Sequence, residues 1–217
     1  MGYYSSERRE LLPHLPDNLG AVLELGCGEG RHGGLLLSNG MASSVVGVDL
    51  HAPSDDAKNL LTSFIRADLS DWLRKTKERF DTVLALDVLE HIENPWEAVE
   101  LCFNVLRPGG QFISSIPNVR FIKVSANLLI RGRFDYCEQG ILDRTHLRFF
   151  TRRSIVNLFS DAGFVDVDIQ RLRYPQQTAI TRLGAVLLRD LGCKQFVITA
   201  SKPKAPTNSI NGKADES

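Results

Sequence analysis

The sequence predicts an α/β fold in which helices cover both faces of an open, largely parallel sheet. Short apolar runs alternate along the chain with longer segments of helical period, which is the pattern of such a sheet. The first five runs are rich in Val, Leu and Ile, as strands buried on both faces should be. The predicted strands are Ala21–Leu25, Val45–Val48, Ser63–Arg66, Thr82–Leu86, Gln111–Ile116, Val165–Gln170 and Gln195–Thr199.

Two helices carry clear start signals. Asn94 can cap the first helix, Pro95 suits its first position, and Glu97 would complete a capping box. Thr151 is the expected cap of the second helix, and Gly163 follows its end. The apolar stripe expected on the first helix is Trp96, Val99, Phe103 and Leu106.

Residues 1–201 form one predicted domain, because 217 residues with 43% hydrophobic content suit a single continuous core. Residues 118–150 are too long for an ordinary connection, so we expect them to form a cap over the substrate. Residues 173–192 form a second insertion with one amphipathic helix. Residues 202–217 are rich in Lys, Pro, Ser and Asn, and we expect them to be disordered.

The composition argues against several function classes. Lys plus Arg and Asp plus Glu both number 26, and a zero formal charge argues against a nucleic-acid partner. The four cysteines lie far apart without a C-x-x-C pair, so we expect neither disulfides nor a metal site. No stretch approaches the ~18 apolar residues of a spanning helix, and the charged N-terminus does not resemble a secretion signal. We therefore expect a cytoplasmic protein.

The most informative stretch is a buried strand that runs into a glycine-rich turn. Gly26, Gly28 and Gly30 let the backbone approach a ligand and take positive φ. Glu24 lies within the apolar strand, where a carboxylate without a partner is costly, so we expect it to face the crevice and meet a donor or a cation. Asp49 ends the next strand about 20 residues on, where an acid accepts hydrogen bonds from ribose hydroxyls. The alternative roles are a backbone-amide partner for Glu24 and a helix cap for Asp49.

The glycines also allow a second interpretation. Gly28, Gly30 and Gly33 have the G-x-G-x-x-G spacing of a nicotinamide dinucleotide site, although that spacing alone is weak support. The rest of the chain distinguishes the two, because it contains several more motifs in a fixed order. These are Glu24-x-Gly26-x-Gly28-x-Gly30, Asp49, Asp68-Leu69, Leu86 to Ile92 and Leu106 to Gly110.

In that order the motifs resemble those of class I S-adenosylmethionine-dependent methyltransferases. The resemblance implies a Rossmann-like open sheet of seven strands in the order 3-2-1-4-5-7-6, with the last strand antiparallel. It also implies S-adenosyl-L-methionine as cofactor and S-adenosyl-L-homocysteine as product. The implied contacts are the loop Gly26–Gly30 with Cys27 at the methionine part, Asp49 and Leu50 at the ribose, Asp68 and Leu69 at the adenine, and Asp87 and Val88 at the floor.

Two further segments resemble a subgroup common in bacterial polysaccharide and small-molecule biosynthesis. They are Tyr3 to Arg8 and Gly140 to Thr151. The resemblance implies that Tyr4 and Arg8 help to close the cofactor pocket. An ordinary amphipathic leader helix with surface tyrosines is the alternative.

Two histidines are candidates for a general base. His146 lies in the cap segment beside Asp143, which is a third catalytic candidate, and His91 follows the fourth predicted strand. A base in reach of a hydroxyl acceptor is worth ~10²–10⁴-fold in rate. The alternative is that both histidines are structural, His146 by tying the cap to the sheet.

The cap carries a local charge. Between residues 118 and 153, eight Lys and Arg residues stand against three acids, which suggests an anionic small-molecule acceptor or merely a solvated basic face. The apolar run Phe121–Ile130, flanked by basic residues, would also allow contact with a membrane surface and a lipid-linked acceptor. The sequence carries no signal for or against a homodimer.

Methyl transfer to a small-molecule acceptor is therefore the leading hypothesis. We expect O-methylation of a sugar, a glycan precursor or another anionic metabolite. A non-catalytic module that binds S-adenosylmethionine, or that partners another enzyme, is the alternative outside enzymes.

Overall fold

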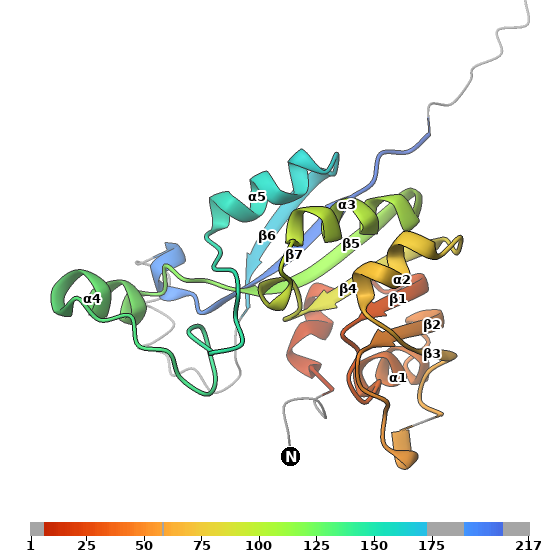
Figure 1. The fold of residues 1–217 in the computed structure, drawn as a ribbon. Coiled ribbons are helices and arrows are strands. Elements are labelled where there is room, and N and C mark those ends of the chain that lie inside the picture. The colour runs from red at the N-terminus through yellow and green to blue at the C-terminus, as the bar shows by residue number, and fades with distance from the viewer. Residues whose placement is uncertain (1–6, 58, 173–188, 206–217) are drawn as a thin grey trace, which may run out of the picture.

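The computed structural model describes residues 7–57, 59–172 and 189–205, which include one seven-stranded sheet (Figure 1). The strand order is β3-β2-β1-β4-β5-β7-β6, which confirms the expected topology. Each of the seven predicted strands is present. Their bounds are β1 Gly20–Leu25, β2 Ala42–Asp49, β3 Ser63–Arg66, β4 Phe80–Leu86, β5 Leu106–Pro117, β6 Val165–Arg171 and β7 Gln195–Ser201.

The direction of the strands decides where a ligand can bind. β1 lies between β2 and β4 and pairs in parallel with both, and β3 and β5 extend the parallel part. β7 runs antiparallel to both β5 and β6, as expected. Because parallel strands end at the same edge, the loops after β1, β2 and β4 gather there.

Helices cover both faces of the sheet, as predicted. On one face α2 (Leu69–Lys75), α3 (Pro95–Val105) and α5 (Arg152–Asp161) pack in one apolar cluster. On the other face α1 (Arg31–Ser38) and the 3₁₀ segment Arg9–His14 pack in a second cluster. Neighbouring residues of one strand enter opposite clusters, since side chains alternate along a strand. Val22 and Leu84 belong to the second cluster, and Leu23 and Val83 to the first.

The two predicted helix starts are present with one difference. Asn94 caps α3 by accepting from the Glu97 amide at 3.4 Å, and Pro95 is the first residue of α3. The Glu97 carboxylate instead accepts from the Asn94 side-chain amide and from Arg74, so it does not complete the predicted capping box. Thr151 caps α5, and there Ser154 completes a capping box.

The stripe predicted for α3 is wrong at its two ends. Trp96 is 52% exposed rather than buried in the core. The Arg148 guanidinium from residues 118–150 lies over its ring, 6.0 Å from the centroid. Leu106 is buried, but it begins β5 instead of extending the helix. Val99 packs in the core as expected.

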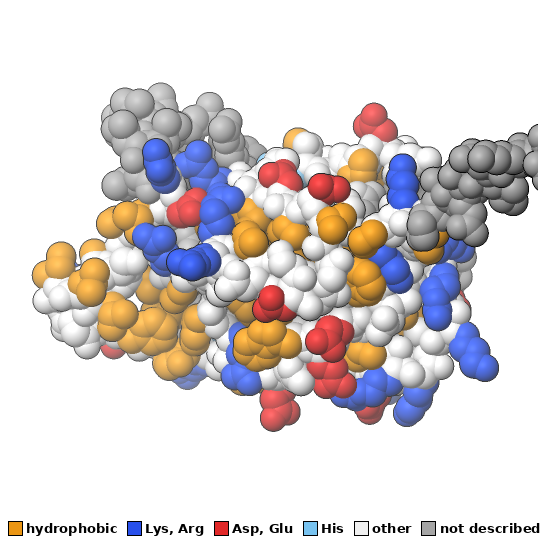
Figure 2. Space-filling view, turned by 90° about the horizontal axis from the view of Figure 1, so that it is seen from above, with side chains coloured by type: hydrophobic (Ala, Val, Ile, Leu, Met, Phe, Trp, Pro, Cys, Tyr) orange, Lys and Arg blue, Asp and Glu red, His pale blue; other side chains and the backbone are white. Residues whose placement is uncertain are grey.

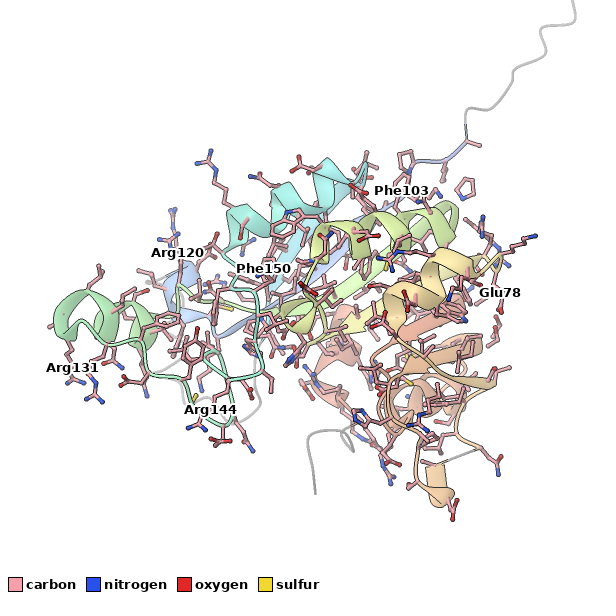
Figure 3. The ribbon with its side chains drawn as sticks, in the orientation of Figure 1. Glu78, Phe103, Arg120, Arg131, Arg144 and Phe150 are labelled. Carbon is pink, nitrogen blue, oxygen red and sulfur yellow. The ribbon has the colours of Figure 1, made fainter. Side chains whose placement is uncertain are left out.

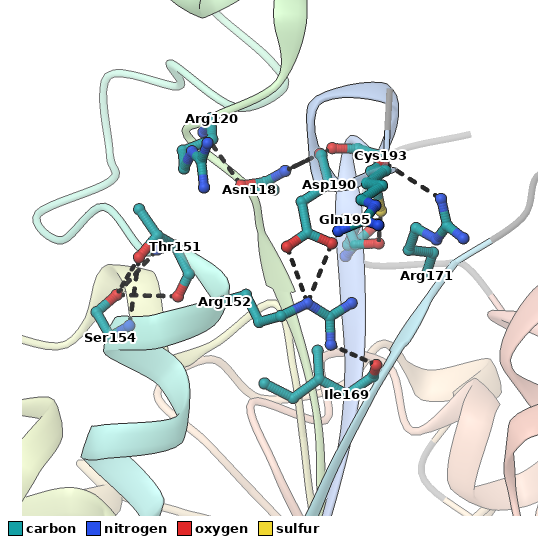
Figure 4. Close-up of polar contacts among 11 residues, drawn as sticks. Asn118, Arg120, Thr151, Arg152, Ser154, Ile169, Arg171, Asp190, Cys193 and Gln195 are labelled. Carbon is teal, nitrogen blue, oxygen red and sulfur yellow. Dashed lines mark hydrogen bonds and ion pairs between the residues drawn. The ribbon is translucent and has the colours of Figure 1, made fainter. Parts of the chain in front are cut away.

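Residues 118–150, here called the cap, leave and rejoin the sheet at one place. Asn118 and Phe150 form an isolated bridge, and Val119 donates to the Phe150 carbonyl at 3.0 Å. The Asn118 amide also donates to the carbonyls of Asp190 and Cys193 (Figure 4). Between these ends the cap carries α4 (Ile122–Arg131), which lies apart from the sheet in Figure 1. The fold therefore holds the cap firmly at its base.

The chain after β7 stays close to the sheet for a short distance. The Lys202 ammonium donates to the carbonyls of Phe103 and Leu106 at 2.7 and 2.8 Å. Residues 206–217 lie outside the described residues. So do residues 173–188, where most of the second predicted insertion and its expected helix fall. Within the described part of the chain no helix is long and apolar enough to cross a membrane.

Candidate active site

A cleft of about 1980 Å³ lies where the carboxyl ends of the parallel strands meet the cap. Its lining comes from the loops after β1, β2 and β4 on one side and from the cap on the other. A drug-sized ligand usually occupies ~300–1,000 Å³. The cleft therefore has room for two small molecules side by side.

The glycine turn shapes one wall of the cleft. Gly26 and Gly28 have φ of 62° and 53°, a region that side chains rarely adopt. A Cβ at Gly26 would meet the Val88 side chain at 2.6 Å, so only glycine fits at this position of the turn. Gly30 has a different role: it is the N-cap of α1, packs against Leu61 and does not line the cleft.

Two carboxylates stand beside the turn. Asp49 is 8% exposed and accepts from the backbone amides of Gly28 and His51 at 2.8 and 2.9 Å. Glu24 is 4% exposed, and its Oε2 has no hydrogen-bond partner among the described residues. Burial, opposed by the Gly33 amide and reinforced by Asp49, raises the pKa of Glu24 to about 8. Glu24 thus has the Gly33 amide as a backbone partner, while its Oε2 has no described hydrogen-bond partner at the cleft.

Asp87 forms the floor between the strands. Its Oδ1 accepts from the Ser115 hydroxyl at 2.8 Å and from the Gln195 amide, and its Oδ2 pairs with Arg8 at 2.5 Å. Its φ of 56° is strained for a residue with a side chain. Arg8 also pairs with Glu10 at 2.7 Å, so the N-terminal segment is tied to the floor.

The remaining predicted cofactor residues divide as follows. Asp68 caps α2 by accepting from the Asp71 amide at 3.0 Å, and it lies at the cleft together with Leu69. Tyr4 lies outside the described residues. The predicted cofactor residues that line the cleft are Arg8, Glu24, Gly26, Cys27, Gly28, Asp49, Leu50, Asp68, Leu69, Asp87 and Val88.

The two candidate bases meet at the cap side of the cleft. The rings of His91 and His146 cross edge to face, with centroids 4.7 Å apart. The Nδ1 of His91 donates to the Thr145 carbonyl at 3.2 Å, and that of His146 to the Ile141 carbonyl at 3.0 Å. In a neutral imidazole this leaves the lone pair on Nε2. Burial, and next the neighbouring His146, lower the pKa of His91, which keeps it neutral at pH 7.

Asp143 makes its described hydrogen bonds within the cap loop and interacts with the two histidines through charge. Its Oδ1 accepts from the Thr145 amide at 2.8 Å and from the Thr145 hydroxyl at 2.7 Å. Burial tends to raise the pKa of Asp143, but these two bonds together with the neighbouring His146 and His91 outweigh it, and the pKa is lowered. Asp143 therefore fixes the turn that presents the Thr145 carbonyl to His91.

Sequence reasoning missed Glu90. This side chain is 1% exposed, lines the cleft, and has no hydrogen-bond partner for either carboxylate oxygen among the described residues. Burial first, and Asp87 second, raise the pKa of Glu90 well above its ordinary value. An acid between Leu89 and Ile92 was the available signal, and it is the same signal that singled out Glu24.

Four of the six basic residues of the cap do not line the cleft. Arg148 donates to the Glu93 carbonyl at 2.5 Å, and it does not line the cleft. Arg144 does line it and pairs with Glu138 at 2.9 Å, while Figure 3 places Arg131 at the far end of α4. Lys123 and Lys194 are further cations in the cleft wall.

Comparison with known proteins gives one family. A family model described as a methyltransferase domain matches residues 2–169. Two relatives are named ubiquinone biosynthesis O-methyltransferase. The one from Psychrobacter arcticus is 31% identical over 70% of this chain, and the one from Stutzerimonas stutzeri is 32% identical over 76%. The chain spans 62% and 72% of these relatives, respectively.

A solved structure shares the fold. The 1,6-didemethyltoxoflavin N1-methyltransferase of Burkholderia thailandensis, crystallised with its substrate and S-adenosylhomocysteine, superposes with a TM-score of 0.62. The alignment covers 93% of this chain and 80% of that one, at 22% identity. The family match includes the glycine turn, which removes the support for a nicotinamide dinucleotide site.

Proposed function

The chain belongs to the methyltransferase domain family and uses S-adenosyl-L-methionine, and from this premise we propose that it methylates a hydroxyl oxygen of a small-molecule acceptor. The observation that carries the proposal is the pairing of His91 and His146, both of which line the same cleft as the glycine turn. The cleft thereby has a cofactor half and an acceptor half.

The residues of the cofactor half fit S-adenosylmethionine. Glu24 has a buried oxygen without a donor, and Gly26 leaves no room for a side chain. Asp49 and Asp68 are the acids that would face the ribose and the adenine. When bound, S-adenosylmethionine supplies a methyl group that its sulfonium has already activated. The protein's remaining tasks are to align the acceptor, worth up to ~7–11 kcal/mol in the best intramolecular cases, and to exclude water.

The acceptor half would take up the hydroxyl proton. The Nε2 of His91 or His146 carries the lone pair, and the backbone carbonyls behind both rings hold them in place. Such a base suits a hydroxyl, which must lose its proton, better than a neutral amine, which attacks through its own lone pair. The relatives named O-methyltransferases support the same choice.

The acceptor class follows from the cleft wall. Lys123, Lys194 and Arg144 line it, so we infer a sugar, a glycan precursor or another metabolite with a carboxylate or phosphate. A lipid-linked acceptor is a second candidate, favoured by the end of α4. There Leu129 and Ile130 are 83% and 82% exposed, and Figure 2 shows hydrophobic side chains gathered at this end of the molecule beside basic ones.

A labelled-methyl screen tests the proposal. The protein is incubated with S-adenosylmethionine carrying a deuterated methyl group and with a bacterial metabolite extract, and the products are identified by mass spectrometry. We expect labelled ethers of anionic metabolites. Label on nitrogen or carbon would overturn the choice of oxygen, and label only in the lipid fraction would favour the second candidate.

A further inference from the structure

Three ligand-type side chains meet under the cap. They are Glu90, His91 and His146, and one donor atom of each lies within 4.8 Å of the other two. Glu90 and His91 are neighbours in the 3₁₀ turn after β4, whereas His146 comes from the cap. The backbone amides of Leu147 and Arg148 donate to the Glu90 carbonyl at 2.8 and 3.0 Å, so the cap is tied to this turn. The fold therefore brings the cluster together and holds it.

Both histidines are oriented as metal ligands are. A ligating imidazole usually donates its other N–H to a carbonyl or carboxylate, which fixes the tautomer and the ring. Here each Nδ1 donates to a backbone carbonyl of the cap, Thr145 for His91 and Ile141 for His146. The Nε2 atom of each ring is left to bind a further group.

Glu90 supplies an independent observation. It is 99% buried, and neither carboxylate oxygen has a hydrogen-bond partner among the described residues. A buried carboxylate is unfavourable unless it is protonated, hydrogen-bonded or neutralised by a cation. The nearby Arg8 is engaged by Asp87 and Glu10. Arg8 gives Glu90 part of its compensating charge but is shared with two other carboxylates, which leaves Glu90 suited to a further cation.

We propose that Glu90, His91 and His146 bind a divalent transition-metal ion, with Zn²⁺ as the best match. Two imidazoles and one carboxylate suit Zn²⁺ and its neighbours, whereas Mg²⁺ and Ca²⁺ prefer oxygen ligands. With bonds of ~2.1 Å, tetrahedral ligands lie roughly 3.4 Å apart, so the ion draws the cap toward the turn. All three residues line the cleft, which leaves the remaining coordination positions facing it.

The bound ion would have a role in the reaction. A hydroxyl oxygen on an open coordination position would release its proton to solvent water more easily, because the cation stabilises the resulting oxyanion. With their Nε2 atoms on the ion, His91 and His146 would then be ligands rather than the base. This role rests on the proposed function. Metal binding itself does not rest on the proposed function, since it can be measured without any acceptor. The metal site and the methyl transfer can therefore be refuted separately.

Metal binding is tested on full-length protein without an affinity tag, after treatment with a chelator. Titration with Co²⁺ should give one ion per chain and an absorption spectrum of nitrogen and oxygen ligands. Zn²⁺ at one hundred times its dissociation constant should raise Tm by about 5–10 °C. A thiolate charge-transfer band, removed by Cys137→Ser, would instead assign the ion to the exposed cysteine of the cap and overturn the proposal.

Variants locate the site. Glu90→Gln and His146→Gln should each weaken Co²⁺ binding by about 100-fold or more, because even outer-shell changes cost 10–100-fold. His14→Gln is the matched control, since His14 does not line the cleft, and it should bind as the wild type does. A melting curve recorded without metal identifies a variant that fails to fold. His91→Gln is then tested in place of that variant. Absence of binding at millimolar Co²⁺, or full binding in the ligand variants, would refute the site.

Discussion

The two halves of the cleft are built in different ways. In the cofactor half, Asp49 is fixed by the amides of Gly28 and His51, which lie within 21 residues of it, and the glycine turn is shaped by its own strand. In the acceptor half, the rings of His91 and His146 touch although they lie 55 positions apart, and neither carboxylate oxygen of the neighbouring Glu90 has a described hydrogen-bond partner. The comparison indicates that the glycine turn and Asp49 are positioned by contacts within 21 residues of the chain, whereas the acceptor half depends on the cap.

The largest effect is expected in the glycine turn. Gly28→Val should abolish binding of S-adenosylhomocysteine, because a β-branched side chain would occupy space needed by the ligand and disfavour the positive φ. Gly40→Val is the matched control: Gly40 also has a positive φ of 69°, but a Cβ there meets nothing within 4 Å. Calorimetry on both variants separates lost ligand space from backbone strain. If Gly28→Val binds S-adenosylhomocysteine as tightly as Gly40→Val and the wild type do, the turn does not contact the cofactor.

A smaller effect on a different quantity is expected in the acceptor half. His146→Ala should lower kcat about 100-fold if the imidazole takes the acceptor proton, with the affinity for S-adenosylhomocysteine unchanged. Steady-state kinetics with an identified acceptor and calorimetry give the two numbers. A variant with full kcat would make His146 a structural residue and transfer the role of base to His91.

Asp49→Ala should weaken the binding of S-adenosylhomocysteine at least tenfold. A hydrogen bond from a ribose hydroxyl to a carboxylate contributes about 1.5–3 kcal/mol. Asp135→Ala is the control, because Asp135 is an exposed residue of the cap that pairs only with Arg133 in the described structure. An unchanged dissociation constant in the folded Asp49 variant would remove this residue from the site.

The buried acid of the cofactor half predicts a pH dependence of stability. The pKa of Glu24 is about 8 in the folded protein against 4.5 ordinarily, so the folded state keeps a proton that the unfolded chain releases. The contribution of protonated Glu24 to the free energy of unfolding is fully present below pH 4.5 and is lost as the pH rises through 8. Between these values the free energy of unfolding falls by up to about 1.4 kcal/mol per pH unit.

Urea unfolding of the wild type and of Glu24→Gln between pH 5 and pH 8 measures this slope. The Gln variant should lack the part of the slope that Glu24 causes. Parallel curves for the two proteins would mean that Glu24 is ionised throughout and already has a partner.

The smallest effect is expected far from the cleft. A chain ending at Ala205 should keep its Tm and its activity, because residues 206–217 have little apolar content to pack. Lys202→Ala should cost about 1 kcal/mol, since it removes the donor to the carbonyls of Phe103 and Leu106. A clear loss of Tm in the shortened chain would mean that the tail docks.

The strands and two helix starts could be predicted from the sequence, because apolar runs and helix caps are local signals, whereas the strand order followed from the family resemblance. All seven strands lie where their apolar runs placed them. The errors arise where a distant segment decides. The helical pattern predicts Trp96 in the core. In the structure its ring is half exposed and contacts the Arg148 guanidinium of the cap. Glu97 reads as part of a capping box, but Arg74 of another helix binds it.

The candidate site divides in the same way. Eleven residues expected at the cofactor line the cleft, since the glycine turn and the strand ends place them there. The acceptor half was predicted only in part: His91 and His146 were singled out one by one, and nothing local predicts that their rings meet. Asp143, a catalytic candidate close to His146 in the sequence, accepts two hydrogen bonds from Thr145. The basic charge of the cap suggested an anion site, yet Arg148 is engaged by a backbone carbonyl instead.

A crystal structure of the complex with S-adenosylhomocysteine tests the central claim most directly. We expect the ribose hydroxyls within hydrogen-bond distance of Asp49, the amino or hydroxyl donors of the ligand near Glu24, and the sulfur directed toward His91 and His146. The space under the cap should stay free for an acceptor. A ligand seated under the cap, with the glycine turn uncontacted, would contradict the division of the cleft into two halves.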